Sequence, residues 1–243
     1  MAKLPIVLLH GAGGSYEATF VGNGWANAIE AAGRTPIGVQ LPGHSSPQAS
    51  RNPDDYRDLA AMLEPALPGG RFDAIGFSLG AKLLLELALR FPARIGRMVL
   101  GGVGDNVFAP ESVAPAVAEA LEHGPNAGTP PPVLVFLKTW SRGSTDPLAL
   151  AAVMRRPANP VFSPERLAQI RVPVLVVNGE LDPVRTLGGR MLAALSDCQS
   201  LTVPGTAHFD LPANRLFMAA ALSFLNRNGT AGAADPRLTE VTP

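Results

Sequence analysis

The feature that most constrains this chain is a serine held between two glycines at Gly76 to Gly80, with the sequence GFSLG. The apolar residues 71–75 predict a buried strand before it, and residues 81–90 after it are rich in helix formers. Ser78 is therefore expected where a strand turns sharply into a helix. Such a turn strains the serine backbone and crowds the positions two residues away, which only glycine fits. This context is typical of a nucleophilic serine, and a serine that only caps a helix is the alternative.

Composition limits the class of protein. The chain has 243 residues, of which 47% are hydrophobic, and this is enough for one large α/β domain. Twenty basic residues balance 20 acidic ones, so we expect no nucleic-acid or anionic-membrane partner. The single cysteine, Cys198, excludes an internal disulfide and indicates a reducing compartment. The apolar run 6–9 is too short for a signal sequence. We expect a soluble, cytoplasmic protein that is a monomer or a small homo-oligomer.

Short apolar segments alternate with helical patterns along most of the chain. This alternation predicts an α/β fold with a mainly parallel central sheet and helices on both faces. The expected strands are 4–9, 35–40, 71–75, 97–103, 172–178 and 200–203.

The alternation stops between residues 105 and 170. Helical patterns there cover 111–122, 133–140 and 147–155, and we interpret the segment as a helical lid over the carboxyl edge of the sheet. The domain division is therefore a core of 1–104 and 171–226, a lid of 105–170, and a disordered tail of 227–243. In the helix after Ser78, charged residues recur every four positions and predict a solvated face: Lys82, Glu86 and Arg90.

A nucleophilic serine needs a base within hydrogen-bond reach. The chain has four histidines. His208 follows the last strand in a loop of small residues that can project a side chain to the carboxyl edge of the sheet. His10 and His44 also follow strands, but each sits in a tight glycine turn, where a structural hydrogen bond is expected. His123 is expected at an exposed helix end in the lid.

The base needs an acid to orient it. Glu180 and Asp182 come directly after the strand 172–178, and either could serve. Pro183 stiffens the turn after Asp182 and favours that residue. Asp105, after the fourth strand, is a further candidate.

Acyl chemistry also needs backbone N–H groups aimed at the developing oxyanion. The residue after the serine, Leu79, can supply one at the N-terminus of the helix. The loop 11–14 (GAGG) can supply another, and Ala12 is the expected donor. A phosphate cradle is the alternative for this loop, but it lacks the Lys-Ser/Thr pair of a P-loop.

Together these motifs resemble the α/β-hydrolase superfamily. Its nucleophile–acid–base order matches Ser78, Asp182 and His208. The resemblance also includes His10-Gly11 after the first strand, and it extends to three further stretches: 41–45, 91–95 and 170–176. It covers residues 4–103 and 171–226. The chain departs from the pattern twice: the leading β-hairpin is missing, and Ala81 replaces a common glycine.

This resemblance implies a serine esterase that forms an acyl-enzyme on a small-molecule ester and needs no metal or cofactor. The residues expected at the substrate are Gly11, Phe77, Phe108, Phe136 and Trp140, with core packing as the alternative for the lid residues. The same triad could instead serve carbon–carbon bond hydrolysis, lactone hydrolysis or perhydrolysis, and a non-catalytic small-molecule receptor is a further alternative.

Overall fold

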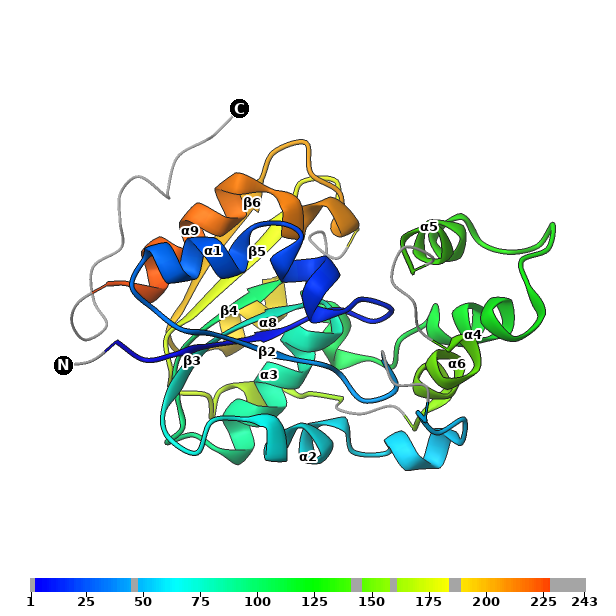
Figure 1. The fold of residues 1–243 in the computed structure, drawn as a ribbon, viewed down its shortest axis with the longest axis horizontal. Coiled ribbons are helices and arrows are strands. Elements are labelled where there is room, and N and C mark those ends of the chain that lie inside the picture. The colour runs from blue at the N-terminus through cyan, green and yellow to red at the C-terminus, as the bar shows by residue number, and fades with distance from the viewer. Residues whose placement is uncertain (1–2, 45–47, 141–145, 158–160, 184–188, 228–243) are drawn as a thin grey trace.

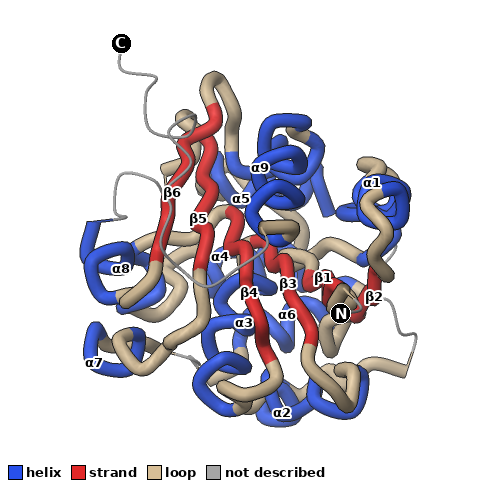
Figure 2. The backbone as a smooth tube through the Cα atoms, turned by 90° about the vertical axis from the view of Figure 1, so that its left-hand side faces the viewer, coloured by secondary structure: helices blue, strands red, loops and turns tan. Residues whose placement is uncertain are grey.

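The sheet of this protein is parallel and six-stranded. A computed structural model describes residues 3–44, 48–140, 146–157, 161–183 and 189–227. Within these ranges the strand order is β2–β1–β3–β4–β5–β6 and every pairing is parallel (Figure 2). The carboxyl ends of all strands therefore meet at one edge. The strands are β1 (Ile6–Leu9), β2 (Pro36–Val39), β3 (Phe72–Phe77), β4 (Ile95–Gly101), β5 (Val174–Gly179) and β6 (Cys198–Val203).

Helices cover both faces of the sheet, as the sequence predicts. The strand β1 shows why, because its alternating side chains enter two separate clusters. Val7 and Leu9 pack into the cluster that α2, α3 and α8 cover. Ile6 and Leu8 pack into the cluster that α1 and α9 cover. The bounds of these helices are α1 (Trp25–Ala31), α2 (Leu59–Leu63), α3 (Leu79–Arg90), α8 (Gly189–Ala194) and α9 (Arg215–Leu225).

Three helices between β4 and β5 form a separate group at the end of the sheet (Figure 1). They are α4 (Ala114–His123), α5 (Pro131–Trp140) and α6 (Pro147–Arg155), close to the helices that the sequence predicts. Their apolar faces form a third cluster, which contacts Ala12 and Phe209 of the core. The two ends of the segment pack differently, because Val107 and Ile170 belong to the main core cluster. We call residues 105–170 the helical insertion.

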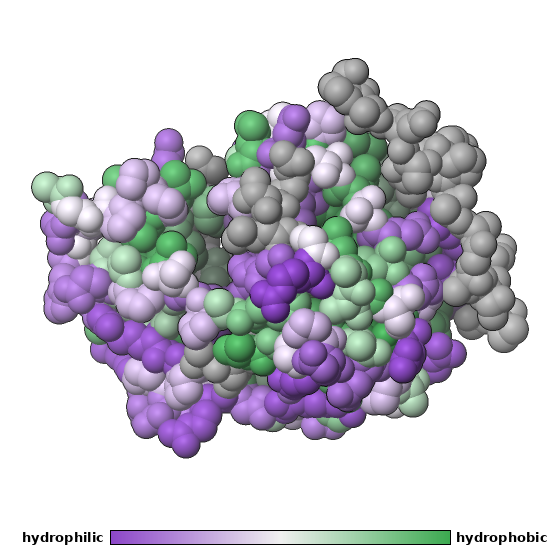
Figure 3. Space-filling view, turned by 180° about the vertical axis from the view of Figure 1, so that it is seen from behind, coloured by the Kyte–Doolittle hydropathy of each residue, from purple (hydrophilic) through white to green (hydrophobic). Residues whose placement is uncertain are grey.

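Several shorter helical turns complete the fold. They are a π-helical turn (Glu17–Val21), the 3-10 turns Pro53–Tyr56, Glu64–Ala66, Asp105–Phe108 and His208–Ala213, and the four-residue helix α7 (Pro164–Leu167). Seen from behind, hydrophilic side chains gather along the lower edge of the molecule (Figure 3). Among the described residues, no helix has the length and apolar character needed to cross a lipid bilayer.

The expectation of a solvated face on α3 is correct for Arg90, which is exposed, but wrong for Lys82 and Glu86. Lys82 and Glu86 are buried, because charged residues from the insertion lie over them. Lys82 Nζ donates to Glu111 at 3.0 Å, and Glu86 accepts from Arg166 at 2.9 Å. A local repeat of charges cannot reveal that a distant segment folds back onto it. The tail beyond residue 227 lies outside the described residues.

Candidate active site

Ser78 occupies a sharp turn between β3 and α3. Its φ of 52° and ψ of −114° lie outside the favourable regions for a residue with a side chain. Among the described residues it is the only non-glycine with a positive φ. A Cβ at Gly76 would lie 2.6 Å from the carbonyl oxygen of Gly80, and one at Gly80 would overlap the carbonyl oxygen of Leu9. Backbone atoms cause both clashes, so the two glycines let the strained turn form.

Two side chains from neighbouring strand ends, His208 and Asp182, extend a hydrogen-bonded path from this serine. His208 Nε2 lies 3.1 Å from Ser78 Oγ, and His208 Nδ1 lies 2.6 Å from Asp182 Oδ2. Asp182 follows β5 and its side chain is fully buried, whereas 19% of the His208 side chain is exposed. An ionised carboxylate can only accept, which places the imidazole proton on Nδ1. In neutral His208, Nε2 is then left to accept the proton of Ser78.

The other candidate acids have different partners. Glu180 accepts a hydrogen bond from the amide of Gly205 at 2.8 Å. Asp105 accepts from the amides of Arg190 and Met191 at the start of α8, at 3.2 and 2.7 Å. In the described chain, Asp182 is the carboxylate that contacts the imidazole.

The glycine loop after β1 is held in place by two buried histidines. His44 Nε2 accepts from the amide of Gly13 at 2.9 Å, and its Nδ1 lies 3.0 Å from the carbonyl of Pro42. His10 Nε2 accepts from the amide of Leu41 at 3.1 Å, and its Nδ1 lies 2.8 Å from the carbonyl of Gly11. The structural roles expected for His10 and His44 are confirmed. Each ring accepts through one nitrogen and donates through the other, which requires the neutral form.

Burial keeps both rings neutral. It lowers the pKa of His10 to about 4, although a hydrogen bond to Gly11 opposes the shift. It lowers the pKa of His44 to about 3, with the nearby charge of His10 acting in the same direction. The hydrogen bonds that shape the glycine loop are therefore intact at neutral pH.

Two backbone amides are free to face a reacting oxygen. Leu79 is the first residue of α3, so its amide has no partner within the helix. In the described part of the chain, the amides of Gly13 and Gly14 are hydrogen-bonded to His44 and Gly11, and the amide of Ala12 has no such bond. A Cβ at Gly11 would lie 3.2 Å from Cβ of Ser78, so the loop is packed directly against the serine.

Aromatic side chains surround the imidazole. The ring of Phe77 lies 4.9 Å from that of His208, measured between centroids, and Phe209 lies 5.1 Å away on an edge-to-face contact. Phe209 in turn contacts Phe136 of α5 at 6.5 Å. A chain of rings therefore connects the insertion to His208. Phe209 was not predicted from the sequence, where only its position next to His208 could have indicated it.

For the other two residues expected at the substrate, Phe108 and Trp140, the described contacts show no link to Ser78. Phe108 packs against the core cluster of α2, α3 and α8, with the guanidinium of Arg190 4.6 Å from its ring centroid. Its described contacts do not include Ser78. The side chain of Trp140 lies outside the described residues. Substrate contact by Gly11, Phe77, Phe108, Phe136 or Trp140 stays a prediction.

Comparison with known proteins identifies one family. A family model described as the alpha/beta hydrolase family matches residues 6–220. The esterase RhEst1 from Rhodococcus sp. ECU1013 superimposes with a TM-score of 0.68 at 25% identity, over 94% of this chain and 92% of that one. The enol-lactonase from Burkholderia xenovorans LB400 superimposes with a TM-score of 0.71 at 19% identity, over 93% and 92% of the two chains. The second likeness supports the fold alone.

One curated relative is similar over a shorter stretch. A 2-hydroxy-6-oxononadienedioate/2-hydroxy-6-oxononatrienedioate hydrolase from Burkholderia vietnamiensis is 32% identical over 128 residues. The match covers 48% of this chain and 41% of that relative, so it spans less than half of either protein.

Proposed function

This chain belongs to the alpha/beta hydrolase family, and we propose that it is a serine hydrolase that cleaves carboxylic esters through an acyl-enzyme on Ser78. The observation that carries the proposal is the continuous hydrogen-bonded path from Ser78 Oγ through His208 to the buried Asp182. A serine hydroxyl is a weak nucleophile at neutral pH, and an adjacent base with an oriented tautomer overcomes this weakness.

The proposed cycle uses these three side chains and two backbone amides. His208 Nε2 takes the proton from Ser78 Oγ as the oxygen attacks the ester carbonyl. The amides of Ala12 and Leu79 stabilise the oxyanion, which in known enzymes is worth about 3–4 kcal/mol per donor. Asp182 stabilises the imidazolium, which then protonates the departing alcohol. Water, activated by His208, repeats the attack on the acyl-enzyme and releases the acid.

The substrate class is a small or medium carboxylic ester with an apolar acyl part. Phe136 is buried and packs through Phe209 towards His208, so the insertion brings apolar surface towards the serine. The similarity to the esterase RhEst1, at 25% identity, agrees with this choice. The substrate is expected to bind without a nucleic-acid or membrane partner.

A second candidate reaction is hydrolysis of a carbon–carbon bond next to a ketone. The 32% identity to a 2-hydroxy-6-oxononadienedioate/2-hydroxy-6-oxononatrienedioate hydrolase favours it, although over less than half of each chain. The same serine and imidazole would serve both reactions. A vinylogous diketone cleaved with a higher kcat/KM than simple esters would favour this candidate over the esterase.

The direct test is hydrolysis of p-nitrophenyl acetate and butyrate by the purified protein. We expect Ser78→Ala to lower kcat by about 10⁴-fold or more, as removal of a triad nucleophile does elsewhere. Ser196→Ala is the matched control, because the described partner of the Ser196 hydroxyl is the carbonyl of Ile170 at 2.8 Å, away from the triad. Ester hydrolysis that persists in the folded Ser78→Ala variant would contradict the proposal.

A further inference from the structure

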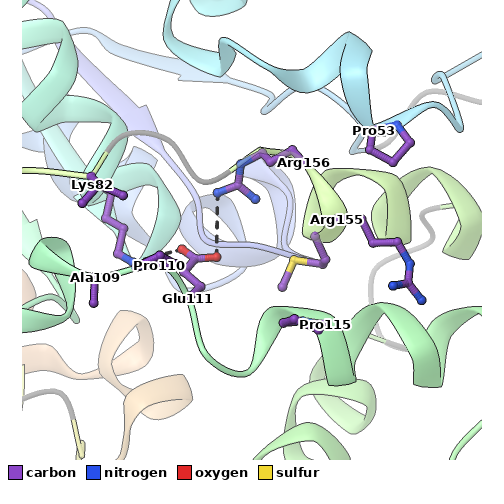
Figure 4. A pocket seen from close by; sticks show the side chains of 10 residues that line it. Pro53, Lys82, Ala109, Pro110, Glu111, Pro115, Arg155 and Arg156 are labelled. Carbon is purple, nitrogen blue, oxygen red and sulfur yellow. Dashed lines mark hydrogen bonds and ion pairs between the residues drawn. The ribbon is translucent and has the colours of Figure 1, made fainter.

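A cavity lies between α3, the start of the insertion and α6 (Figure 4). Its volume is about 520 Å³, and Ser78, Ala12, Phe77 and His208 are not among the residues that line it. Both charged and apolar side chains line it. The charged ones are Lys82, Glu111, Arg155 and Arg156, and the apolar ones include Pro110, Pro115 and Met154. The cavity is large enough for a small organic molecule and offers it two kinds of surface.

The charges around the cavity do not balance. The side chains of Lys82 and Arg156 are only 8% and 5% exposed, and Glu111 is the carboxylate between them. Glu111 lies 3.0 Å from Lys82 Nζ and 3.7 Å from the Arg156 guanidinium, as the dashed lines in Figure 4 mark. Two buried cations therefore share one anion.

Arg156 is the less satisfied of the two cations. One of its terminal nitrogens donates to the carbonyl of Val153 at 2.6 Å. Its Nε is buried and has no hydrogen-bond partner among the described residues. A buried guanidinium donor without an acceptor is costly, so Arg156 keeps unmet capacity for hydrogen bonding in this region.

The pKa shifts of Arg156 and Glu111 reflect their burial and their mutual attraction. Burial lowers the pKa of Arg156 below its ordinary value, and Glu111 offsets this only in part. Although burial acts to raise the pKa of Glu111, Lys82 and Arg156 hold it below its usual range. Glu111 is therefore ionised at neutral pH, and its single negative charge faces the two positive charges of Lys82 and Arg156.

We propose that this cavity binds a small carboxylic acid, with the carboxylate between Arg156 and Lys82 and the apolar part against Pro110, Pro115 and Met154. A carboxylate matches the planar donor array of a guanidinium. The apolar wall favours an organic acid over an inorganic anion. The proposal does not depend on the reaction at Ser78.

The site lies across the junction of the core and the insertion. The amide of Lys82 donates to the carbonyl of Ser78 at 3.1 Å, so Lys82 is one turn along the helix that presents the serine. Met154 belongs to the insertion cluster, against which Ala12 packs. A bound acid would contact both parts of the molecule at once.

The test is the affinity of the whole protein for benzoate, measured by calorimetry, with benzamide as the uncharged analogue. We expect benzoate to bind at least about tenfold more tightly than benzamide, because a charge-assisted hydrogen bond is worth about 1.5–3 kcal/mol. Arg156→Gln and Lys82→Gln should each weaken benzoate binding by about tenfold. Equal affinity for the two probes would overturn the proposal.

Two further variants make the result independent of folding defects. Glu111→Gln removes the competing carboxylate, so benzoate should bind more tightly, which a damaged fold cannot produce. Arg57→Gln is the matched control, because the exposed Arg57 guanidinium pairs with Asp54 and Arg57 is not among the residues that line the cavity. The proposal is wrong if Glu111→Gln binds benzoate less tightly, or if Arg57→Gln weakens binding as much as Arg156→Gln.

Discussion

Two histidines that take no part in the proposed chemistry shape the loop on which it depends. His10 and His44 accept hydrogen bonds from the amides of Leu41 and Gly13, so each must remain neutral. Their pKa values of about 4 and about 3 lie below the ordinary value of 6.5. As a consequence, the stability of the folded protein depends on pH.

The free energy of unfolding is expected to fall as the pH is lowered from 6.5 towards 5. In that window the unfolded chain protonates His10 and His44 and the folded chain does not, so acid favours unfolding. Each histidine contributes a slope of about 0.7 kcal/mol per pH unit at pH 6.5, which approaches about 1.4 kcal/mol per pH unit near pH 5. Urea denaturation at several pH values measures this slope. In His44→Gln the slope should be smaller by the contribution of one histidine.

His123→Gln is the control for that experiment, because His123 is 68% exposed and its ion-pair partners among the described residues are Glu119 and Glu122. Between pH 5 and 6.5, the free energy of unfolding of the His123→Gln variant should change with pH as it does in the unaltered protein. A slope that His44→Gln leaves unchanged would show that His44 is not a buried neutral acceptor.

The most predictable element of this fold is the strand–turn–helix unit of β3 and α3. Its glycines are constrained by local geometry, so the sequence alone indicates where the turn lies. The buried face of α3 was not predictable in this way, since Glu111 and Arg166 come from distant parts of the chain. The contact of Phe136 with Phe209 is equally non-local. Local patterns determine the elements, and long-range contacts determine which faces are buried.

Gly80→Ala should prevent folding or lower the free energy of unfolding by more than about 3 kcal/mol, because overpacking against backbone cannot be relieved by a side-chain shift. A Cβ at this position would overlap the carbonyl oxygen of Leu9. Soluble yield and urea denaturation are the measurements. Gly69→Ala is the matched control, because a Cβ there meets nothing within 4 Å. If the two variants were equally stable, the close packing of the turn would be disproved.

On the scale of the whole molecule, one buried ion pair connects segments from both ends of the described chain. The guanidinium of Arg34 contacts Asp73 at 2.5 Å and the carbonyls of Leu4 and Leu225 at 2.8 and 3.0 Å. Asp73 also accepts from the amide of Arg97 at 2.7 Å. The amino-terminal parts of β1, β2, β3 and β4 and the carboxyl end of α9 are thereby held together at the edge of the sheet away from Ser78.

Asp73→Ala should lower the free energy of unfolding by about 3–5 kcal/mol, because it leaves the Arg34 charge buried without a counter-ion. The exposed pair of Arg57 and Asp54 provides the control, at 2.7 Å with both side chains more than 60% exposed. Arg57→Ala should change stability by less than about 1 kcal/mol. Activity towards esters should survive Asp73→Ala wherever the protein remains folded, and its selective loss would contradict a purely structural role.

The central claim is that His208 activates Ser78, and covalent labelling tests it most directly. The protein is treated with a fluorophosphonate, digested, and analysed by mass spectrometry. We predict one adduct, on the peptide that contains Ser78, and a labelling rate that falls by at least about 10³-fold in His208→Ala. An adduct on another residue, or labelling of Ser78 that His208→Ala leaves unchanged, would contradict the account.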